Sequence, residues 1–206
     1  IGIGALMYAQ DYDETLMRAA VTSGTVTYYW WASWDGAVRD DTKGLLYPYM
    51  KSHQVQTCPS FRNELRTNIG LTGYGYNYVY LSPSNYDANW NEVPVPVTLA
   101  QAQHPSDTVM MADCARYRTW GAGAPVFEGN AYLDPPSNAF PGAHARHSGM
   151  ADVVWLDGHA KAMKPLFHPA GTTFGYGNNA DDFIRQGLGD LDRDGNFQTD
   201  ELFSLQ

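Results

Sequence analysis

Twelve residues near the C-terminus, 190–201 (DLDRDGNFQTDE), restrict the local backbone more than any other segment of this sequence. Oxygen-bearing residues stand at positions 1, 3, 5, 7, 9 and 12 of the segment, and Gly195 stands at position 6. This is the pattern of an EF-hand calcium loop, whose alternate residues converge on one cation only if the backbone reverses at the sixth residue. Glycine permits that reversal because it lacks a Cβ atom.

The segment predicts one calcium site built from six residues. They are Asp190, Asp192, Asp194, Asn196 through its backbone carbonyl, Gln198, and Glu201 as the bidentate carboxylate. The alternative is a polar turn with a chance run of acids, which a match at every ligand position disfavours. Residues 181–188 can form a short entering helix, but only LFSLQ follows Glu201. We therefore expect a single structural site and not a paired calcium sensor that opens a groove.

Composition limits the classes of partner. The 206 residues are 44% hydrophobic and 17% charged, as expected for one globular domain or a domain with an appendage. A net charge of −9 with 13 basic residues argues against nucleic acid or an anionic membrane as a partner, because few groups could neutralise phosphates. No apolar run approaches the roughly 18 residues of a membrane span. The acidic balance favours divalent cations.

Cys58 and Cys114 permit one intramolecular disulfide, or they are two buried thiols that behave as small apolar side chains. The sequence leaves both alternatives open. The many tyrosine, tryptophan, glycine and asparagine residues favour an extracellular location.

The sequence predicts several elements before the C-terminal region. Residues 1–16 form a helix or a shorter helix followed by an acidic turn, and residues 108–114 (TVMMADC) form a buried strand. The other expected segments are strands within 25–34, a short helix or turn at 42–52, strand alternation followed by loops over 69–96, a short turn or helix at 99–107, and a long surface loop at 120–140.

A second D-x-N-x-N series, Asp87, Asn89 and Asn91, could contribute to another calcium site, but no glycine follows it. A hydrated loop is the favoured interpretation. Residues 150–163 (MADVVWLDGHAKAM) predict a β-hairpin around Asp157-Gly158, a dipeptide typical of the two-residue type I′ turn.

His147 lies ten residues before Asp157 and completes an H-x9-DG pattern. Together with this motif, five segments resemble prepilin-like proteins that carry a C-terminal H-x9-DG motif, which are bacterial relatives of type IV pilins and type II secretion pseudopilins. The segments are ALMYAQDYDETL (5–16), LLYPYMKSHQVQTCPS (45–60), GYGYNY (73–78), HPSDTVMMADC (104–114) and RHSGMADVVWLDGHAKAM (146–163).

The resemblance implies an α+β, pilin-like fold in which an N-terminal helix packs on an antiparallel β-sheet. Under this interpretation 1–206 is a single domain, with 1–16 the remnant of the helix, 17–168 the sheet and long loops, and 181–206 the calcium-loop appendage. The family's hydrophobic stem is absent before Ile1, so we expect the chain to begin inside a longer, membrane-anchored precursor. Proteolytic release of this head, which would then assemble through other surfaces, is the favoured hypothesis.

The expected function is therefore a calcium-stabilised structural subunit of an extracellular filament or pilus-like homopolymer at the cell surface. The alternatives are a minor pseudopilin of a secretion system or an extracellular carbohydrate-binding module that uses exposed aromatic side chains.

An enzyme is not expected. His147, Ser148 and Asp157 have the residue types of a triad, and His144, His147 and His159 those of a metal site. No nucleophile elbow, HExxH or phosphate loop accompanies them. A histidine bonded to a hairpin-turn aspartate is an ordinary way to fix a turn, so His147 and Asp157 are predicted instead to pair and stabilise the end of the sheet.

Overall fold

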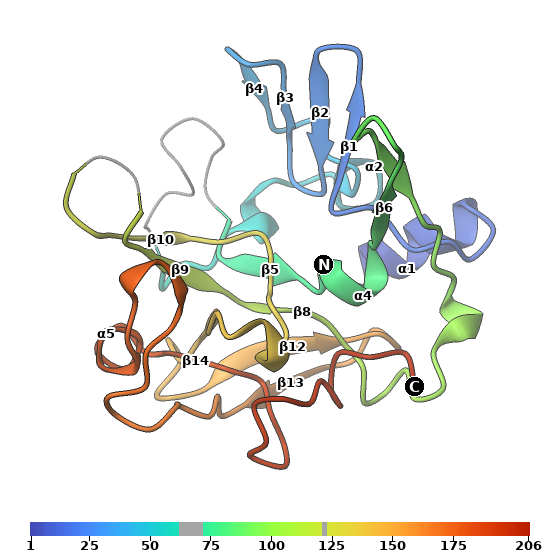
Figure 1. The fold of residues 1–206 in the computed structure, drawn as a ribbon. Helices are drawn as coiled ribbons and strands as arrows, with labels where there is room; N and C mark the ends of the chain where they lie inside the picture. Colours follow the sequence, from blue (N-terminus) through green and yellow to red (C-terminus); the bar gives the residue numbers. More distant parts are fainter. Residues whose placement is uncertain (62–71, 121–122) are drawn as a thin grey trace.

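The computed structural model describes residues 1–61, 72–120 and 123–206, and shows a mixed α+β protein with antiparallel sheets and few helices (Figure 1). Residues 69–71 of the predicted strand-rich segment and 121–122 of the predicted loop lie outside this range. In the described part of the chain, no helix has the length and apolar character needed to cross a bilayer.

The central sheet has the strand order β13-β12-β8-β5, and every neighbouring pair is antiparallel. Its strands are β5 (Tyr74–Tyr76), β8 (Val109–Asp113), β12 (Ala151–Trp155) and β13 (Ala160–Met163). All five residues of β8 are buried, which confirms the predicted buried strand. The strand has a continuous apolar run instead of alternation because it contributes residues to two separate core clusters.

A second four-stranded sheet, at the top of Figure 1, contains the aromatic segment. Its strands are β1 (Ala20–Ser23), β2 (Val26–Tyr29), β3 (Ser33–Trp34) and β4 (Arg39–Asp40). The aromatic segment is thus two short strands, and Trp30 and Trp31 occupy the break between them. Both residues are almost fully buried. The backbone N–H groups of Leu45 and Leu46 donate to the Tyr29 and Trp30 carbonyls and hold a later segment of the chain beside them.

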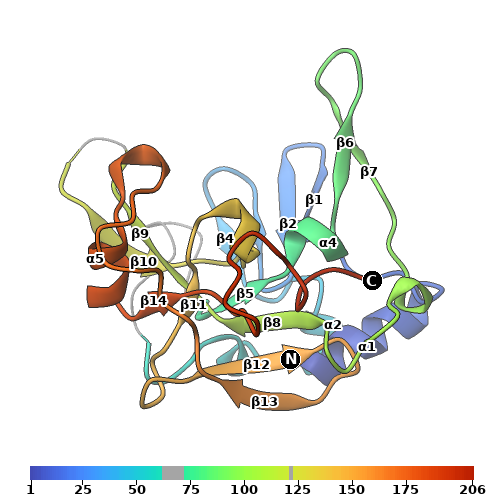
Figure 2. The same cartoon turned by 60° about the horizontal axis from the view of Figure 1, so that its bottom comes forward.

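Helix α1 (Gly2–Asp11) contacts its surroundings through small residues. A Cβ on Gly4 would lie 3.0 Å from Met50 of α2 (Tyr47–Met50), and one on Gly2 would lie 2.6 Å from Val154 of β12. Figure 2 shows α1 beside strand β12 of the central sheet. The helix ends at Asp11, and the acids that follow lie on an exposed turn, as the shorter-helix alternative predicted.

The β12–β13 hairpin forms as predicted, but the type I′ turn at Asp157-Gly158 is wrong. Gly158 has a φ of 91°, whereas Asp157 is not among the residues with positive φ. The Gly158 N–H donates to Trp155 and the Trp155 N–H to His159, which gives a three-residue loop with glycine at its last position. Glycine suits this position because of its φ of 91°, and a Cβ would also lie 2.6 Å from the end of the Leu6 side chain of α1.

The predicted pairing of His147 and Asp157 is also wrong. Strand β12 lies between them, so they stand at its opposite ends. Asp157 Oδ1 instead lies 2.6 Å from His159 Nδ1 and accepts from the His159 N–H at 3.0 Å.

The segment predicted as a long surface loop, 120–140, contains strand β10 (Val126–Gly129), which pairs with β9 (Ala115–Arg118). No alternation of apolar residues marks this strand in the sequence, because a buried ion pair helps to hold it against β9. Glu128 is buried and lies 2.6 Å from the Arg116 guanidinium on β9. A paired carboxylate of this kind cannot be recognised from local apolar spacing.

The remaining elements are short and surround the two sheets. They are α4 (Tyr78–Leu81), α5 (Ala180–Arg185), β6 (Ser84–Tyr86), β7 (Glu92–Pro94), β11 (Ala143–His144), β14 (Leu188–Gly189), and 3-10 turns at Gln54–Gln56, Leu99–Gln101, Pro136–Asn138 and Gly175–Gly177. The predicted short helices near residues 47 and 99 correspond to α2 and one of these 3-10 turns.

His144 of β11 makes the protein sensitive to acid. Its ring packs between Phe61 and Phe127, and burial lowers its pKa from 6.5 to about 4, with Arg146 adding to the effect. As pH falls from 6.5 toward 4, the unfolded chain takes up a proton that the folded protein excludes, so the free energy of unfolding falls. Urea unfolding should show that His144→Phe loses less stability than wild type between pH 7 and pH 4.5.

The matched control is His53→Phe at an exposed position, which should keep the wild-type pH dependence. An equal loss of unfolding free energy in wild type and His144→Phe would contradict this assignment.

Candidate functional site

The predicted calcium loop is positioned by three elements in succession. Helix α5 overlaps the predicted entering segment 181–188 and begins where the Asn179 side chain accepts from the Asp182 N–H at 2.9 Å. Strand β14 then pairs with β11. Asp190, at loop position 1, exchanges two backbone hydrogen bonds of 2.9 Å with Leu166. The first ligand residue therefore has a fixed backbone.

Within the loop, carboxylates hold the backbone in the reversed conformation. Gly195 has a φ of 76°, and its N–H donates to Asp192 Oδ1 at 2.7 Å. The Arg193 N–H donates to Glu201 Oε1 at 2.7 Å, which brings position 12 back to the start of the loop. One carboxylate oxygen from each of Asp192, Asp194 and Glu201 lies within 4.8 Å of the others.

Three carboxylate oxygens in this loop are buried and receive no hydrogen bond from any residue that the structure describes. They are Asp190 Oδ1, Asp192 Oδ2 and Glu201 Oε2, at loop positions 1, 3 and 12. Asp192 and Glu201 each use one oxygen to hold the loop and leave the other unpaired. Buried carboxylate oxygens without a donor are costly, and a hard cation held by Asp192, Asp194 and Glu201 would offset that cost within this close group.

The carboxylate of Asp190 is also buried, which disfavours its charged form. Burial raises its pKa to about 6, although His168 Nε2 lies 2.7 Å from Asp190 Oδ2 and opposes that rise. The His168 ring stacks on Phe197 of the loop at 3.8 Å between ring centroids. Positions 1 and 8 of the loop are therefore joined through one histidine, and a divalent cation would favour the charged carboxylate.

Two of the predicted ligands are directed elsewhere. The Asn196 carbonyl accepts from both the N–H and the hydroxyl of Thr199, at 2.9 and 2.8 Å. The Gln198 side-chain amide donates to the Phe197 carbonyl at 3.3 Å. The described geometry therefore brings three of the predicted ligands together, Asp192, Asp194 and Glu201, whereas Asn196 and Gln198 would have to turn and Asp190 lies outside this close group.

The end of the loop joins the core of the protein. Leu191, Leu202 and Phe203 are buried in one cluster with residues of β8 and β12. The Val109 N–H donates to the Leu202 carbonyl at 2.7 Å, and Asn77 Nδ2 donates to the Phe203 carbonyl at 2.9 Å. The segment predicted as an appendage thus shares a hydrophobic core with the central sheet.

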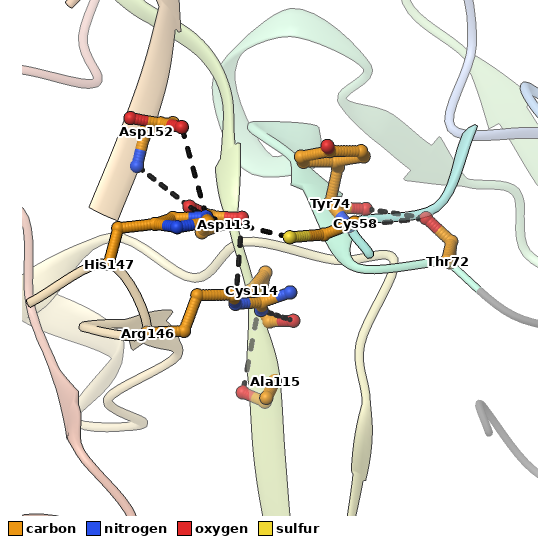
Figure 3. Close-up of polar contacts among 9 residues, drawn as sticks. All are labelled: Cys58, Thr72, Tyr74, Asp113, Cys114, Ala115, Arg146, His147 and Asp152. Carbon is orange, nitrogen blue, oxygen red and sulfur yellow. Dashed lines mark hydrogen bonds and ion pairs between the residues drawn. The ribbon is translucent and has the colours of Figure 1, made fainter. Parts of the chain in front are cut away.

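A second polar cluster joins Cys58, Asp113 and His147 (Figure 3). His147 Nε2 lies 3.5 Å from Cys58 Sγ and 3.3 Å from Asp113 Oδ2. Asp113 is fully buried at the end of β8, and burial raises its pKa despite the Arg146 guanidinium, whose Nε lies 3.5 Å away. Asp152 of β12 donates its N–H to Asp113 Oδ2 at 2.8 Å.

Sequence reasoning did not find this cluster. It treated Cys58 as half of a disulfide or as an inert thiol, and Cys58 and Cys114 are both free and buried. It grouped His147 with His144 and His159, but His144 packs among phenylalanines and His159 stacks on Trp155. The only available signal was an aspartate at the end of an otherwise apolar strand.

The possible second calcium series is an ordinary turn in the structure. Asp87 Oδ1 accepts from the N–H groups of Asn89 and Asn91, both at 2.8 Å, and Asp87 Oδ2 accepts from the Asn91 amide. The carboxylate therefore closes its own loop, which matches the hydrated-loop interpretation.

Searches for similar proteins find no matching family model, no related curated protein and no matching solved structure. The arguments below therefore rest on the residues and their geometry.

Calcium should raise the melting temperature of the protein, and Glu201→Gln should remove most of that gain because it deletes the charge at position 12. At free calcium about 100 times the Kd, binding stabilises a folded protein by about 2.7 kcal/mol. Thermal unfolding in calcium and in chelator measures the difference. Glu14→Gln, an exposed acid on the turn after α1, is the control and should respond as wild type does. Equal wild-type melting temperatures in calcium and chelator would refute the calcium site.

Gly189→Ala should destabilise the protein by about 1 to 3 kcal/mol, because a Cβ at this position would overlap the Leu166 carbonyl beside Asp190. Gly175→Ala is the control, since Gly175 is exposed, has open space around it and has no positive φ. Urea unfolding in chelator compares the two variants. Equal stabilities would show that the backbone before the loop is not tightly held.

Proposed function

We propose that this protein is a calcium-stabilised structural subunit of an extracellular filament or pilus-like polymer. The observation that carries the proposal is the group of three buried, unpaired carboxylate oxygens at positions 1, 3 and 12 of the C-terminal loop. An extracellular medium rich in calcium would supply their counter-ion continuously. The calcium-bound loop would then hold the C-terminal segment against the central sheet.

Assembly into a polymer is supported by apolar side chains on the surface. Ile3 and Met7 are 72% and 44% exposed and lie four residues apart, on one face of α1. Exposed apolar groups on a neighbouring pair of helical positions suit contact with another copy of the chain. This face of α1 would be one of the surfaces, other than the hydrophobic stem of pilin-like proteins, through which copies of the chain assemble. A minor pseudopilin of a secretion system would use the same surface.

Carbohydrate binding is the second candidate, and one observation favours it. Trp90 and Tyr86 are 83% and 62% exposed on the projecting β6–β7 hairpin, with ring centroids 6.3 Å apart (Figure 2). Exposed aromatic rings of this kind can stack on sugar faces, and they also serve protein interfaces.

Negative-stain electron microscopy at high protein concentration, in calcium and then in chelator, tests the polymer. We expect assemblies in calcium that shorten or disperse when calcium is removed. Ile3→Glu should reduce assembly by placing a charge on the apolar face of α1. Val38→Glu, at another position that is 64% exposed, is the control and should assemble as wild type does.

Monomers under every condition would contradict the polymer. Binding of a glycan array by that monomer, abolished by Trp90→Ala, would establish the carbohydrate-binding alternative instead.

A further inference from the structure

The cluster of Cys58, Asp113 and His147 lacks the arrangement of a catalytic relay. A Cys-His-Asp relay uses the two ring nitrogens separately, one toward the nucleophile and the other toward the acid. Here the same atom, His147 Nε2, faces Cys58 Sγ at 3.5 Å, Asp113 Oδ2 at 3.3 Å and Asp152 Oδ2 at 3.8 Å. One nitrogen carries at most one hydrogen, so hydrogen bonding can satisfy only one of these three neighbours at a time.

The same distances match the ligand-to-ligand separations in a tetrahedral metal site. Zinc binds imidazole nitrogen and carboxylate oxygen at about 2.0–2.2 Å and thiolate sulfur at about 2.3 Å in a tetrahedron. Tetrahedral angles then place nitrogen and oxygen ligands about 3.4 Å apart, and nitrogen and sulfur about 3.5 Å apart. The observed separations of 3.3 Å and 3.5 Å agree with both values.

Each donor comes from a different segment, and its surroundings hold it in place. Asp113 ends the buried strand β8 and is fixed by the Asp152 N–H and by Arg146. His147 begins a tight turn through Ser148 and Gly149, both with positive φ, closed by two 3.0 Å hydrogen bonds to Met150. Cys58 accepts from the Phe61 N–H at 3.0 Å through its carbonyl. Such outer contacts orient metal ligands.

Charge and access also suit a divalent ion. Cys58 as a thiolate, Asp113 and Asp152 would carry three negative charges, which the ion and Arg146 together balance. The Arg146 guanidinium is held 4.1 Å above the Phe61 ring and donates to the Cys114 carbonyl, so it remains in the site. The His147 side chain is 33% exposed, so solvent reaches the cluster there, and Asp152 also lines an open hollow of about 220 Å³.

From this geometry we propose that Cys58, Asp113 and His147 bind one zinc-class transition-metal ion, with the exposed side chain of Asp152 turning in as the fourth ligand. The ion displaces the thiol proton of Cys58 and any proton on His147 Nε2, and both protons leave to solvent. The site differs in chemistry from the calcium loop, because sulfur and nitrogen donors select zinc, cobalt or copper over calcium.

Cobalt(II) titration of the whole protein, with calcium saturating, tests the proposal. A thiolate bound to cobalt gives a near-ultraviolet charge-transfer band, and tetrahedral cobalt gives strong visible bands. We expect both in wild type at one ion per chain, with reversal by one equivalent of zinc. Cys58→Ser should abolish the charge-transfer band. His147→Ala should weaken cobalt binding by at least about 100-fold, more than the roughly 10- to 100-fold loss for an outer-shell partner.

The matched controls are Cys114→Ala and His159→Ala. Burial raises the pKa of the Cys114 thiol, and this residue lies outside the cluster, so its removal should leave the spectrum intact. Circular dichroism establishes which variants fold. The absence of a charge-transfer band in wild type, or its loss in Cys114→Ala and persistence in Cys58→Ser, would overturn the proposal. In the first case, the contacts of His147 with Asp113 and Asp152 would serve only to hold the end of strand β8.

Discussion

The complete burial of strand β8 is the constraint on which the remaining structure depends. Its backbone groups must be satisfied inside the protein, and β12 and β5 supply the partners along its two edges. The Val109 N–H at its start donates to Leu202, beside the calcium loop, and Asp113 at its end belongs to the cysteine–histidine cluster. Four residue steps of about 3.4 Å separate these ends by about 14 Å. One strand thus positions both candidate ion sites.

The second constraint is the burial of carboxylates. Asp113, Asp190 and Asp192 are each at most 2% exposed in a protein with a net charge of −9. Buried acids remain charged only beside cations or donors, and the two sites meet this need differently. Arg146 and His147 surround Asp113. In the loop, backbone N–H groups hold some oxygens and leave others for an ion. Under both proposals, a bound ion would help this fold tolerate its buried acids.

The histidine and the glycine of the H-x9-DG pattern have separate structural roles in this fold. Strand β12 fills most of the spacer, so the histidine and the glycine act at opposite ends of one strand. His147 enters the polar cluster, whereas Gly158 leaves room for Leu6 of helix α1. The motif is therefore two separate sites joined by a strand, and not a histidine–aspartate pair. The motif's spacing would allow a pair only if the intervening residues folded back, whereas they form the extended strand β12.

The reversal of the C-terminal loop at Gly195, the buried strand β8 and the N-terminal helix were determined by sequence alone, because each depends on residues that are neighbours along the chain. The loop needs only its own twelve residues and one glycine conformation, and the strand needs only a continuous apolar run. Only the tertiary structure decided the Cys58, Asp113 and His147 cluster, the strand within 120–140 and the contact of the C-terminal segment with the core. These depend on strand pairing between distant segments and on buried charge pairs such as Arg116 and Glu128, neither of which leaves a local period in the sequence.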